Sequence, residues 1–349
     1  MNILISPNAF KGTMSALEAG EIIQDFLFKN FPQVNLKLLP IADGGDGTCE
    51  LLTQILDLKK RSDMVLDPFG RPVEGFYGWD EHTKTAYVDV STASGIAIIG
   101  KEPLNPYVAS TYGTGQVIRA AIDGGAEQII LGLGGSATVD LGIGILAALG
   151  IDFLDQNGRE LIPFSPNYLS KIRHIQKSPR IPKIKILCLC DVKNKSTEME
   201  SYESVCKSAV FQIFQKQKRT FEDKPGFGAA GGIGLGLSAF FETDIKHGAQ
   251  YFFEKVNLSE QVGWADLIIT GEGRYDNQSK EGKACYELMK LAQNQNKKIA
   301  LITSGNENGI EEFDQVLRLP DLDYNQSNFR DRAKENLRAL LTNKLSLDF

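Results

Sequence analysis

Residues 265–274 read ADLIITGEGR, a short apolar run that ends in a glycine turn carrying Glu272 and Arg274. Such a run is typical of a buried strand in a parallel sheet, and the carboxyl ends of parallel strands are where these sheets bind ligands. The pattern recurs at four other places, NILISPNAFKG (2–12), AEQIILGLGGSATVD (126–140), IKILCLCDV (184–192) and KKIALITSGN (297–306). The sequence therefore predicts an α/β fold built on parallel strands.

The segments between these strands differ in character along the chain. Near the N-terminus, apolar residues over 15–30 recur at helical spacing between two strands. From about residue 60, short strand-like pieces separated by turns indicate an antiparallel meander, and the first pattern returns after residue 262. We predict a Rossmann-like parallel-sheet domain with a second α/β domain inserted into it. The predicted parts are 1–61 with 263–349, and 62–262.

Composition excludes several classes of protein. The 349 residues carry 38 Lys and Arg against 44 Asp and Glu, a formal net charge of −6. This mild acidity disfavours a broad nucleic-acid face, which needs a clustered basic surface. No apolar run approaches the ~18 residues of a membrane span, and the N-terminus lacks a signal-peptide pattern. We therefore expect a cytoplasmic protein with five reduced cysteines and no membrane or nucleic-acid partner.

Polar side chains follow the predicted strands at the edge where ligands bind. They are Lys11; Asp43 and Asp46; Ser136, Thr138 and Asp140; Asp191 and Asn194; Glu272, Arg274 and Asp276. Glycine turns at helix starts bind phosphate, and carboxylates beside phosphate indicate Mg²⁺, so the combination predicts phosphoryl transfer. Each piece also has a structural interpretation, such as an N-cap at Asp46 or Ser136, or a surface ion pair of Arg274 with Asp276.

Standard catalytic motifs are missing, among them G-x-x-x-x-G-K-[ST], H-R-D, D-F-G, G-x-S-x-G and H-E-x-x-H. One rival pattern does follow a predicted strand. Gly132, Gly134 and Ala137 fit G-x-G-x-x-A, the fingerprint of dinucleotide-binding sites. Asp140 would then lie close to the pyrophosphate, which counts against this reading. A NAD-type site is kept as the less favoured alternative.

Seven segments spread over most of the chain carry a more specific pattern. They are SPNAFKGTMSA (6–16), LPIADGGDGT (39–48), STYGTGQVI (110–118), LGLGGSATVDLGIG (131–144), CDVKN (190–194), PGFGAAGGIGLG (225–236) and ADLIITGEGRYDNQSKEGK (265–283). In this order they resemble the class I glycerate kinase family. The resemblance implies two α/β domains with an active-site cleft between them. It also implies that ATP and Mg²⁺ are used to phosphorylate D-glycerate, commonly to 2-phosphoglycerate; a homodimer is one expected assembly.

The resemblance also implies a set of site residues. The matching positions are Lys11, Asp43, Gly44, Gly45, Gly134, Gly135, Ser136, Asp191, Asn194, Glu272, Arg274 and Asp276. Lys11 and Arg274 are expected to offset negative charge on phosphate and on the substrate carboxylate. Asp191 is expected to orient the attacking hydroxyl or accept its proton. Asp43 and Asp276 are the candidate Mg²⁺ ligands, and the turn with Gly134, Gly135 and Ser136 is expected to hold ATP phosphates.

Three departures from the family pattern keep alternatives open. Asn8 stands where the family has Asp, the GGSAT turn continues as Val139-Asp140-Leu141-Gly142 instead of N-D-G-G, and a glycine-rich stretch after CDV has become rich in Glu and Lys. Such changes would fit a kinase of a related hydroxy acid. They would also fit a catalytically weakened relative that still binds a nucleotide or metabolite.

Overall fold

A computed structural model describes residues 1–100, 103, 105, 107–195, 212, 213, 215–217, 222–305 and 310–347. The chain forms two compact units. Unit 1 consists of Met1–Asp43 and Ala249–Phe349, and unit 2 consists of Gly44–Gly248. Unit 2 is thus inserted into unit 1. It begins and ends earlier in the chain than the inserted domain predicted over 62–262. Each unit is described by itself below.

Unit 1 is built on five parallel strands in the order β2-β1-β11-β12-β13. Their bounds are β1 (Asn2–Ile5), β2 (Asn35–Leu38), β11 (Leu267–Arg274), β12 (Lys298–Ser304) and β13 (Gln315–Arg318). Counted along the unit, the order is 2-1-3-4-5, which is the flavodoxin-like form of the doubly wound fold. The order reverses between β1 and β11, and ligands of such sheets bind at the carboxyl ends of the strands at this switch point.

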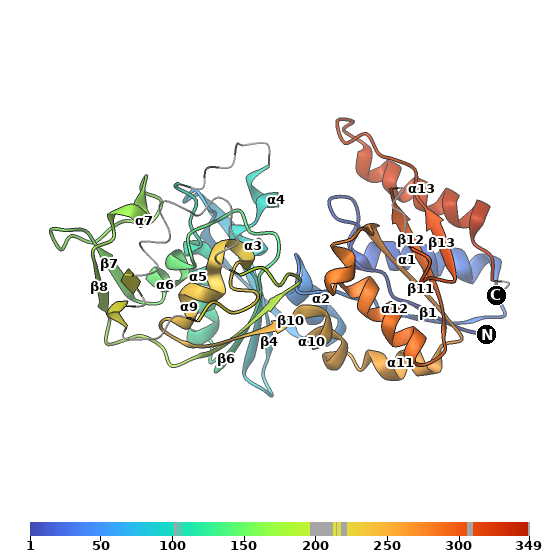
Figure 1. The fold of residues 1–349 in the computed structure, drawn as a ribbon, viewed down its shortest axis with the longest axis horizontal. Helices are drawn as coiled ribbons and strands as arrows, with labels where there is room; N and C mark the ends of the chain where they lie inside the picture. Colours follow the sequence, from blue (N-terminus) through green and yellow to red (C-terminus); the bar gives the residue numbers. More distant parts are fainter. Residues whose placement is uncertain are drawn as a thin grey trace. The chain divides into compact units, whose positions relative to one another are not determined.

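Helices cover both faces of this sheet (Figure 1). On one face α1 (Ala16–Asn30) packs against α13 (Phe329–Lys344), and on the other α11 (Leu258–Trp264) packs against α12 (Ala284–Asn294). Ser15 begins α1 with a capping box, because its hydroxyl accepts from the Glu18 N–H while the Glu18 carboxylate accepts from the Ser15 N–H. Unit 1 also contains α10 (Gly248–Lys255) and the short helix η4 (Ser279–Glu281).

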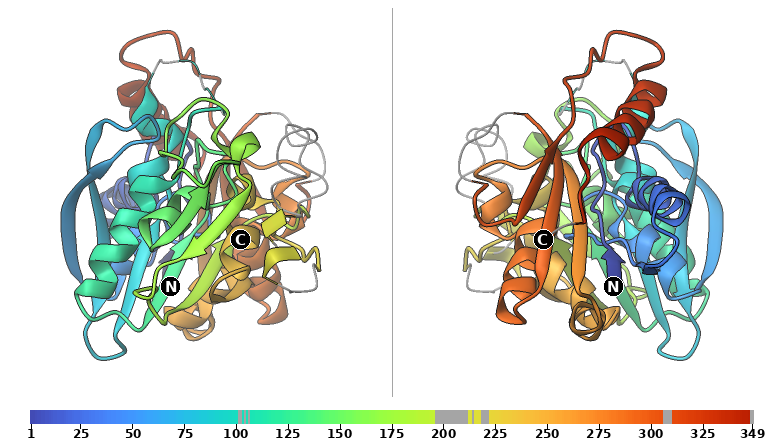
Figure 2. Two further views of the ribbon diagram at one scale, coloured as in Figure 1. Left: turned by 90° about the vertical axis from the view of Figure 1, so that its left-hand side faces the viewer. Right: turned by 90° about the vertical axis from the view of Figure 1, so that its right-hand side faces the viewer.

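Unit 2 contains a six-stranded sheet in the order β10-β9-β6-β5-β4-β3. The bounds are β3 (Lys59–Leu66), β4 (Pro72–Asp80), β5 (Thr85–Asp89), β6 (Gln128–Gly132), β9 (Lys185–Cys190) and β10 (Glu242–His247). The strands from β5 to β10 pair in parallel, whereas β3, β4 and β5 form the predicted antiparallel meander at one edge (Figure 2, blue). A separate hairpin joins β7 (Ile151–Leu154) to β8 (His174–Lys177). Both main sheets therefore confirm the predicted α/β class.

Helices also cover both faces of the six-stranded sheet. A Cβ on Gly78 of β4 would overlap Thr53 of α2 (Thr48–Ile55), and one on Gly75 would come 2.6 Å from Val117 of α5 (Tyr112–Asp123). Strand positions three apart face opposite sides, so α2 and α5 lie on different faces. The remaining helices are α3 (Ser91–Ser94), α4 (Ile96–Ile99), α6 (Ile143–Ala148), α7 (Tyr168–Lys171), η3 (Ala229–Gly232) and α9 (Ile233–Ser238).

The packing of α2 explains the difference in the domain boundary. This helix lies against β4, β5 and β6, so it belongs to unit 2 although the sequence placed it in the first domain. Cys206 lies outside the described residues. The other four cysteines are buried free thiols. Among the described helices, none is long and apolar enough to cross a membrane.

Candidate functional site

The switch point of unit 1 brings the turn after β1 onto the end of β11. Two glycines in TGEG make this approach possible. A Cβ on Gly271 would lie 2.8 Å from the Phe10 ring, and one on Gly273 would lie 3.2 Å from the Lys11 backbone nitrogen. Since both distances are tighter than an ordinary contact, side chains here would force the turn away from the strand. The glycines therefore place Lys11 beside the end of β11, where Glu272 and Arg274 are also found.

Asn8 and Asp43 form the first polar contact of this region. The Asn8 side-chain amide donates a hydrogen bond of 3.0 Å to the Asp43 carboxylate, and the Asn8 carbonyl oxygen accepts from the Ala9 N–H at 2.8 Å. Asp43 is buried, with 8% of its surface exposed. The sequence marked Asn8 only as a departure from the family pattern, whereas the structure makes it a partner of the expected metal ligand.

Glu272 is the most perturbed acid at the switch point. It is 5% exposed, and burial together with the neighbouring Asp43 charge raises its pKa to about 8, although Lys283 and Ser279 act in the opposite direction. Among the described residues, no group hydrogen-bonds to its Oε1 atom. A buried carboxylate oxygen without a donor carries a large desolvation cost. This atom is therefore suited to receive a proton or a cation.

Asp276 lies in the turn that precedes the short helix η4. Its carboxylate accepts from the Ser279 N–H at 3.2 Å, and its own N–H donates to the Ser279 hydroxyl at 3.2 Å. This reciprocal pair fixes the turn, so one oxygen of the Asp276 carboxylate has a structural role. Asp276 also contributes to the raised pKa of Glu272, which places the two carboxylates in one electrostatic neighbourhood. Its expected role as a metal ligand remains a prediction.

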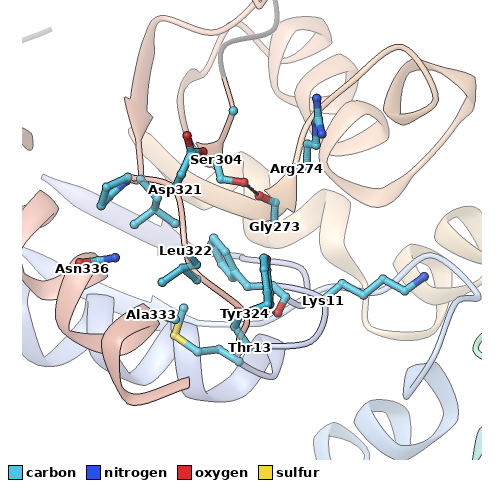
Figure 3. Close-up of a pocket in the computed structure, with 15 residues that line it drawn as sticks. Lys11, Thr13, Gly273, Arg274, Ser304, Asp321, Leu322, Tyr324, Ala333 and Asn336 are labelled. Carbon is cyan, nitrogen blue, oxygen red and sulfur yellow. Dashed lines mark hydrogen bonds between the residues drawn. The ribbon is translucent and has the colours of Figure 1, made fainter. Parts of the chain in front are cut away.

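Lys11 and Arg274 are both exposed and line a cavity in unit 1 (Figure 3). Lys11 comes from the turn after β1, and Arg274 is the last residue of β11. Exposed cations at the carboxyl end of a parallel sheet can bind phosphate or carboxylate groups. The structure thus brings five of the expected residues to the switch point of unit 1, namely Lys11, Asp43, Glu272, Arg274 and Asp276.

In unit 2, glycines bring several turns together backbone to backbone. A Cβ on Gly134 would overlap the backbone of Gly45 and Asp46, and one on Gly44 would lie 2.8 Å from the backbone nitrogen of Cys190. The GGSAT turn, the GGDGT turn and the strand end that carries Asp191 therefore pack directly on one another. The family motifs are rich in glycine here because the turns themselves leave no room for side chains.

The GGSAT turn keeps backbone donors available. No acceptor among the described residues bonds to the N–H groups of Gly134, Gly135 and Ser136. The turn is fixed from one side, since the Ala137 N–H donates to Ser94 and the Ile96 N–H donates to the Gly135 carbonyl. Successive unused N–H groups in a rigid turn form an anion-binding nest. The geometry is thus compatible with the phosphate-binding role expected for this turn.

Asp140 has a structural role that the sequence did not reveal. Its buried carboxylate accepts from the Thr111 N–H at 2.8 Å, the Thr111 hydroxyl at 2.9 Å, and the Gly142 and Gly144 N–H groups at 3.1 Å each. Burial raises its pKa, while these hydrogen bonds act to lower it. Because the first N–H groups of α6 are already bonded to this carboxylate, they cannot hold a pyrophosphate. The structure therefore argues against the dinucleotide alternative.

Leu141, one of the departures from the family pattern, is explained by packing. It adopts a left-handed backbone with φ of 60°, which is costly for a branched side chain, and its side chain is 1% exposed in the core of unit 2. The Leu141 side chain therefore adds apolar contacts to the core of unit 2.

Asp191 and Asn194 follow β9. Asp191 is half-buried, and Asn194 is exposed. The backbone carbonyl of Asn194 accepts from the N–H groups of Gly226 and Gly228 at 3.1 and 3.0 Å, which fastens this segment to the GFGAAGG turn. The expected role of the Asn194 side chain in binding substrate or phosphate stays a prediction. The Glu- and Lys-rich departure over 196–211 lies outside the described residues.

A second buried carboxylate, also missed by sequence analysis, begins α2. Asp89 at the end of β5 accepts from the N–H groups of Cys49 and Glu50 at 3.0 and 2.9 Å. It is 3% exposed, and burial raises its pKa to about 7. Asp89 thereby fixes the helix that follows the GGDGT turn.

A doubly wound sheet with carboxylates and cations at its strand ends, in a chain that also carries a glycine turn with unused N–H groups, is typical of an α/β protein equipped for phosphoryl transfer. The model of the Glycerate kinase family matches residues 3–197 and 195–346. The chain therefore belongs to the glycerate kinase family.

Several relatives support this assignment. A glycerate kinase of Bacillus subtilis (strain 168) is 36% identical over 313 residues, which cover 84% of this chain and 82% of the relative. A glycerate 2-kinase of Escherichia coli (strain K12) is 32% identical over 327 residues, 86% of this chain and 84% of the relative. A crystal structure assigned to glycerate kinase 2 of Salmonella typhimurium LT2 superposes with a TM-score of 0.80 at 29% identity, covering 97% of this chain and 95% of that one.

Proposed function

We propose that this protein transfers the γ-phosphoryl group of ATP to a hydroxyl of D-glycerate and forms 2-phosphoglycerate. One observation carries the proposal: Lys11, Asp43, Glu272 and Arg274 converge at the switch point of a doubly wound sheet in a chain that matches the family from end to end. The names of the Bacillus and Escherichia relatives, glycerate kinase and glycerate 2-kinase, support the substrate and the position that is phosphorylated.

The residues at the switch point fit a magnesium ion. Within the described ranges, no three His, Cys, Asp or Glu side chains form a ready-made metal cluster. Mg²⁺ does not need one, because it usually takes one or two carboxylates and completes its shell with phosphate oxygens and water. The buried Asp43 and the unpartnered Oε1 of Glu272 offer such oxygens, and Asp276 lies in the same electrostatic neighbourhood. When bound, Mg²⁺ would neutralise phosphate charge and orient the γ-phosphoryl group.

The protein's own groups would then divide the remaining work. Lys11 and Arg274 bind anionic oxygens of ATP or the carboxylate of glycerate, and the N–H groups of Gly134, Gly135 and Ser136 bind phosphate oxygens. The attacking hydroxyl oxygen forms a bond to the γ-phosphorus as the bond to the bridging oxygen of ADP breaks. Asp191 accepts the hydroxyl proton.

A kinase of another hydroxy acid is the second candidate, because Asn8 changes the charge next to Asp43. An Asp at this position, as the family pattern has it, would place one more negative charge at the switch point. The acceptor acid is therefore the part of the proposal that needs the broadest test.

A coupled assay of ADP release tests the proposal. Purified protein is mixed with ATP, Mg²⁺ and D-glycerate, alongside Lys11→Ala, Asp191→Ala and the exposed control Lys29→Ala. We expect glycerate-dependent ADP release that falls at least about 100-fold in the first two variants and is unchanged in the control. The absence of turnover with every hydroxy acid tested, although the protein is folded, would contradict the proposal.

A further inference from the structure

Unit 1 contains a cavity of about 510 Å³ at the carboxyl ends of its strands (Figure 3). Its walls come from the turn after β1, the ends of β11 and β12, the segment after β13, and α13. Cavities of about 300–1,000 Å³ enclose ligands of drug size, whereas glycerate has only three carbons. The cavity is therefore too large to be explained by the acid alone.

The two ends of the cavity differ in chemistry. Lys11 and Asn336 lie at opposite ends of the group of lining residues, with Arg274 nearer to the Lys11 end (Figure 3). Part of the wall is apolar, since Phe10, Met14 and Ala333 contribute to it. A fully hydroxylated acid gains nothing from such a wall, because its polar groups would lose water without gaining partners.

The end away from Lys11 carries groups that can recognise a heterocycle. Asn336 on α13 offers both a donor and an acceptor, and Asp321 offers a carboxylate. Tyr324 adds an aromatic ring between these groups and the Lys11 ammonium (Figure 3), and this ring rests against Phe329 with 5.5 Å between ring centroids. Apolar walls with a few fixed polar groups and an aromatic side chain are typical of pockets for planar ligands.

The walls of the cavity are held in place from outside it. Lys334 on α13 forms an ion pair of 2.6 Å with Glu18 on α1, which ties the helix that carries Asn336 to the rest of unit 1. On the other side, the Ser304 hydroxyl donates to the Gly273 carbonyl and joins the ends of β12 and β11 (dashed line in Figure 3). These two contacts fix opposite walls of the cavity.

We propose that this cavity binds the nucleoside part of a nucleoside triphosphate, with the base against Phe10, Tyr324 and Asn336 and the phosphates toward Lys11 and Arg274. This inference rests on the proposed kinase function and adds the place and orientation of the phosphate donor in unit 1. It assigns Asn336 and Tyr324, which no sequence motif marks, to nucleotide recognition.

Binding measured by calorimetry, without glycerate, separates this inference from the kinase activity. Adenosine and inorganic tripolyphosphate serve as probes for the two ends, and ATP serves as the complete ligand. Asn336→Ala should weaken adenosine and ATP about 5- to 13-fold, the effect of one hydrogen bond, and leave tripolyphosphate unchanged. Lys11→Ala should weaken tripolyphosphate and ATP and leave adenosine unchanged. The exposed Asn343→Ala on the same helix is the matched control.

Kinetics supply the second readout. In an active enzyme, Asn336→Ala and Tyr324→Ala should raise the KM for ATP and leave the KM for the acid within twofold. An unchanged affinity for ATP and adenosine in both variants would overturn the inference while leaving the kinase function standing. A rise in the KM for the acid alone would also overturn it, because the cavity would then hold the acid. If the wild type shows no turnover but its nucleotide binding still depends on Asn336, the result would contradict only the kinase function.

Discussion

Replacing Asp140 by Asn tests the claim that one buried carboxylate organises the glycine turns of unit 2. The amide can keep its oxygen toward Thr111 and Gly144, but its nitrogen then faces the Gly142 N–H, which loses its acceptor. A hydrogen bond to a charged group contributes about 1.5–3 kcal/mol, and a neutral one about 0.5–1.5 kcal/mol. Burial raises the pKa of Asp140 despite these bonds, so relief of the buried charge offsets the weakening of the three that remain. The buried Gly142 N–H, however, loses its acceptor and faces the amide NH2 group, so we expect a net loss of about 3 kcal/mol.

The assay is thermal unfolding of the two proteins at pH 7, with Asp123→Asn as the control. For a unit of this size, about 3 kcal/mol corresponds to a melting temperature lowered by about 6–12 °C. Asp123 is exposed and forms a surface ion pair with Arg119 on the same helix, so its replacement should change stability by less than about 1 kcal/mol. Asp140→Ala, which removes both acceptor oxygens, should lower the melting temperature further than Asp140→Asn does. An Asp140→Asn protein that melts with the wild type would refute the reasoning.

Three further predictions follow from the switch point and the glycine turns. In EDTA, the stability of Glu272→Gln relative to wild type should rise by about 1.4 kcal/mol per pH unit between about pH 5 and 8. The reason is that the Glu272 carboxyl of the folded wild type keeps its proton to about pH 8, whereas that of the unfolded chain loses it at lower pH, so wild-type stability falls as the pH rises. A difference in unfolding free energy that stays constant across this range would disprove the prediction. Asn8→Asp should lower the melting temperature in EDTA, because it places a second carboxylate against Asp43. Added Mg²⁺ should raise the melting temperature of this variant more than that of the wild type. An equal rise in the two proteins would count against the metal assignment. Gly134→Ala should destabilise unit 2 by at least about 1–3 kcal/mol in urea unfolding, because the added Cβ would overlap the backbone of Gly45 and Asp46. The control Gly263→Ala, within α11, should be neutral or stabilising. Similar effects of the two substitutions would disprove the close packing of the turns.

The arrangement of strands was largely predictable from the sequence. The apolar run before GEGR and its four counterparts became β11, β1, β6, β9 and β12, all with parallel partners. These strands could be identified from the sequence because a strand buried on both faces is a continuous apolar run, and because each run is followed by a turn that contains glycine or charged residues. The residues at the ends of these strands could be identified for the same reason.

The domain boundary could not be predicted in the same way. The helix after GGDGT has an apolar face that would fit either sheet, and only its contact with β4, β5 and β6 assigns it to unit 2. Local sequence carries the periodicity of a helix but does not specify which sheet it covers.

Several site contacts were also beyond the reach of local patterns. Asp140 and Asp89 read as turn or strand-end acids, and their partners Thr111 and Cys49 are 29 and 40 residues away. Asn8 shows its role only when Asp43 is brought beside it by the sheet. The nucleotide pocket depends on α13, whose residues Ala333 and Asn336 belong to an ordinary amphipathic helix in the sequence. Long-range packing, which no motif records, defines these parts.

The most direct test of the account is a phosphorus NMR spectrum of protein mixed with ATP, Mg²⁺ and D-glycerate. The account predicts that the γ-phosphate signal of ATP decays while a new phosphomonoester doublet grows, split by the single proton on C2, as expected for 2-phosphoglycerate. A triplet from the C3 methylene would contradict the 2-position. Unchanged ATP, or free phosphate as the sole product, would contradict the proposed kinase.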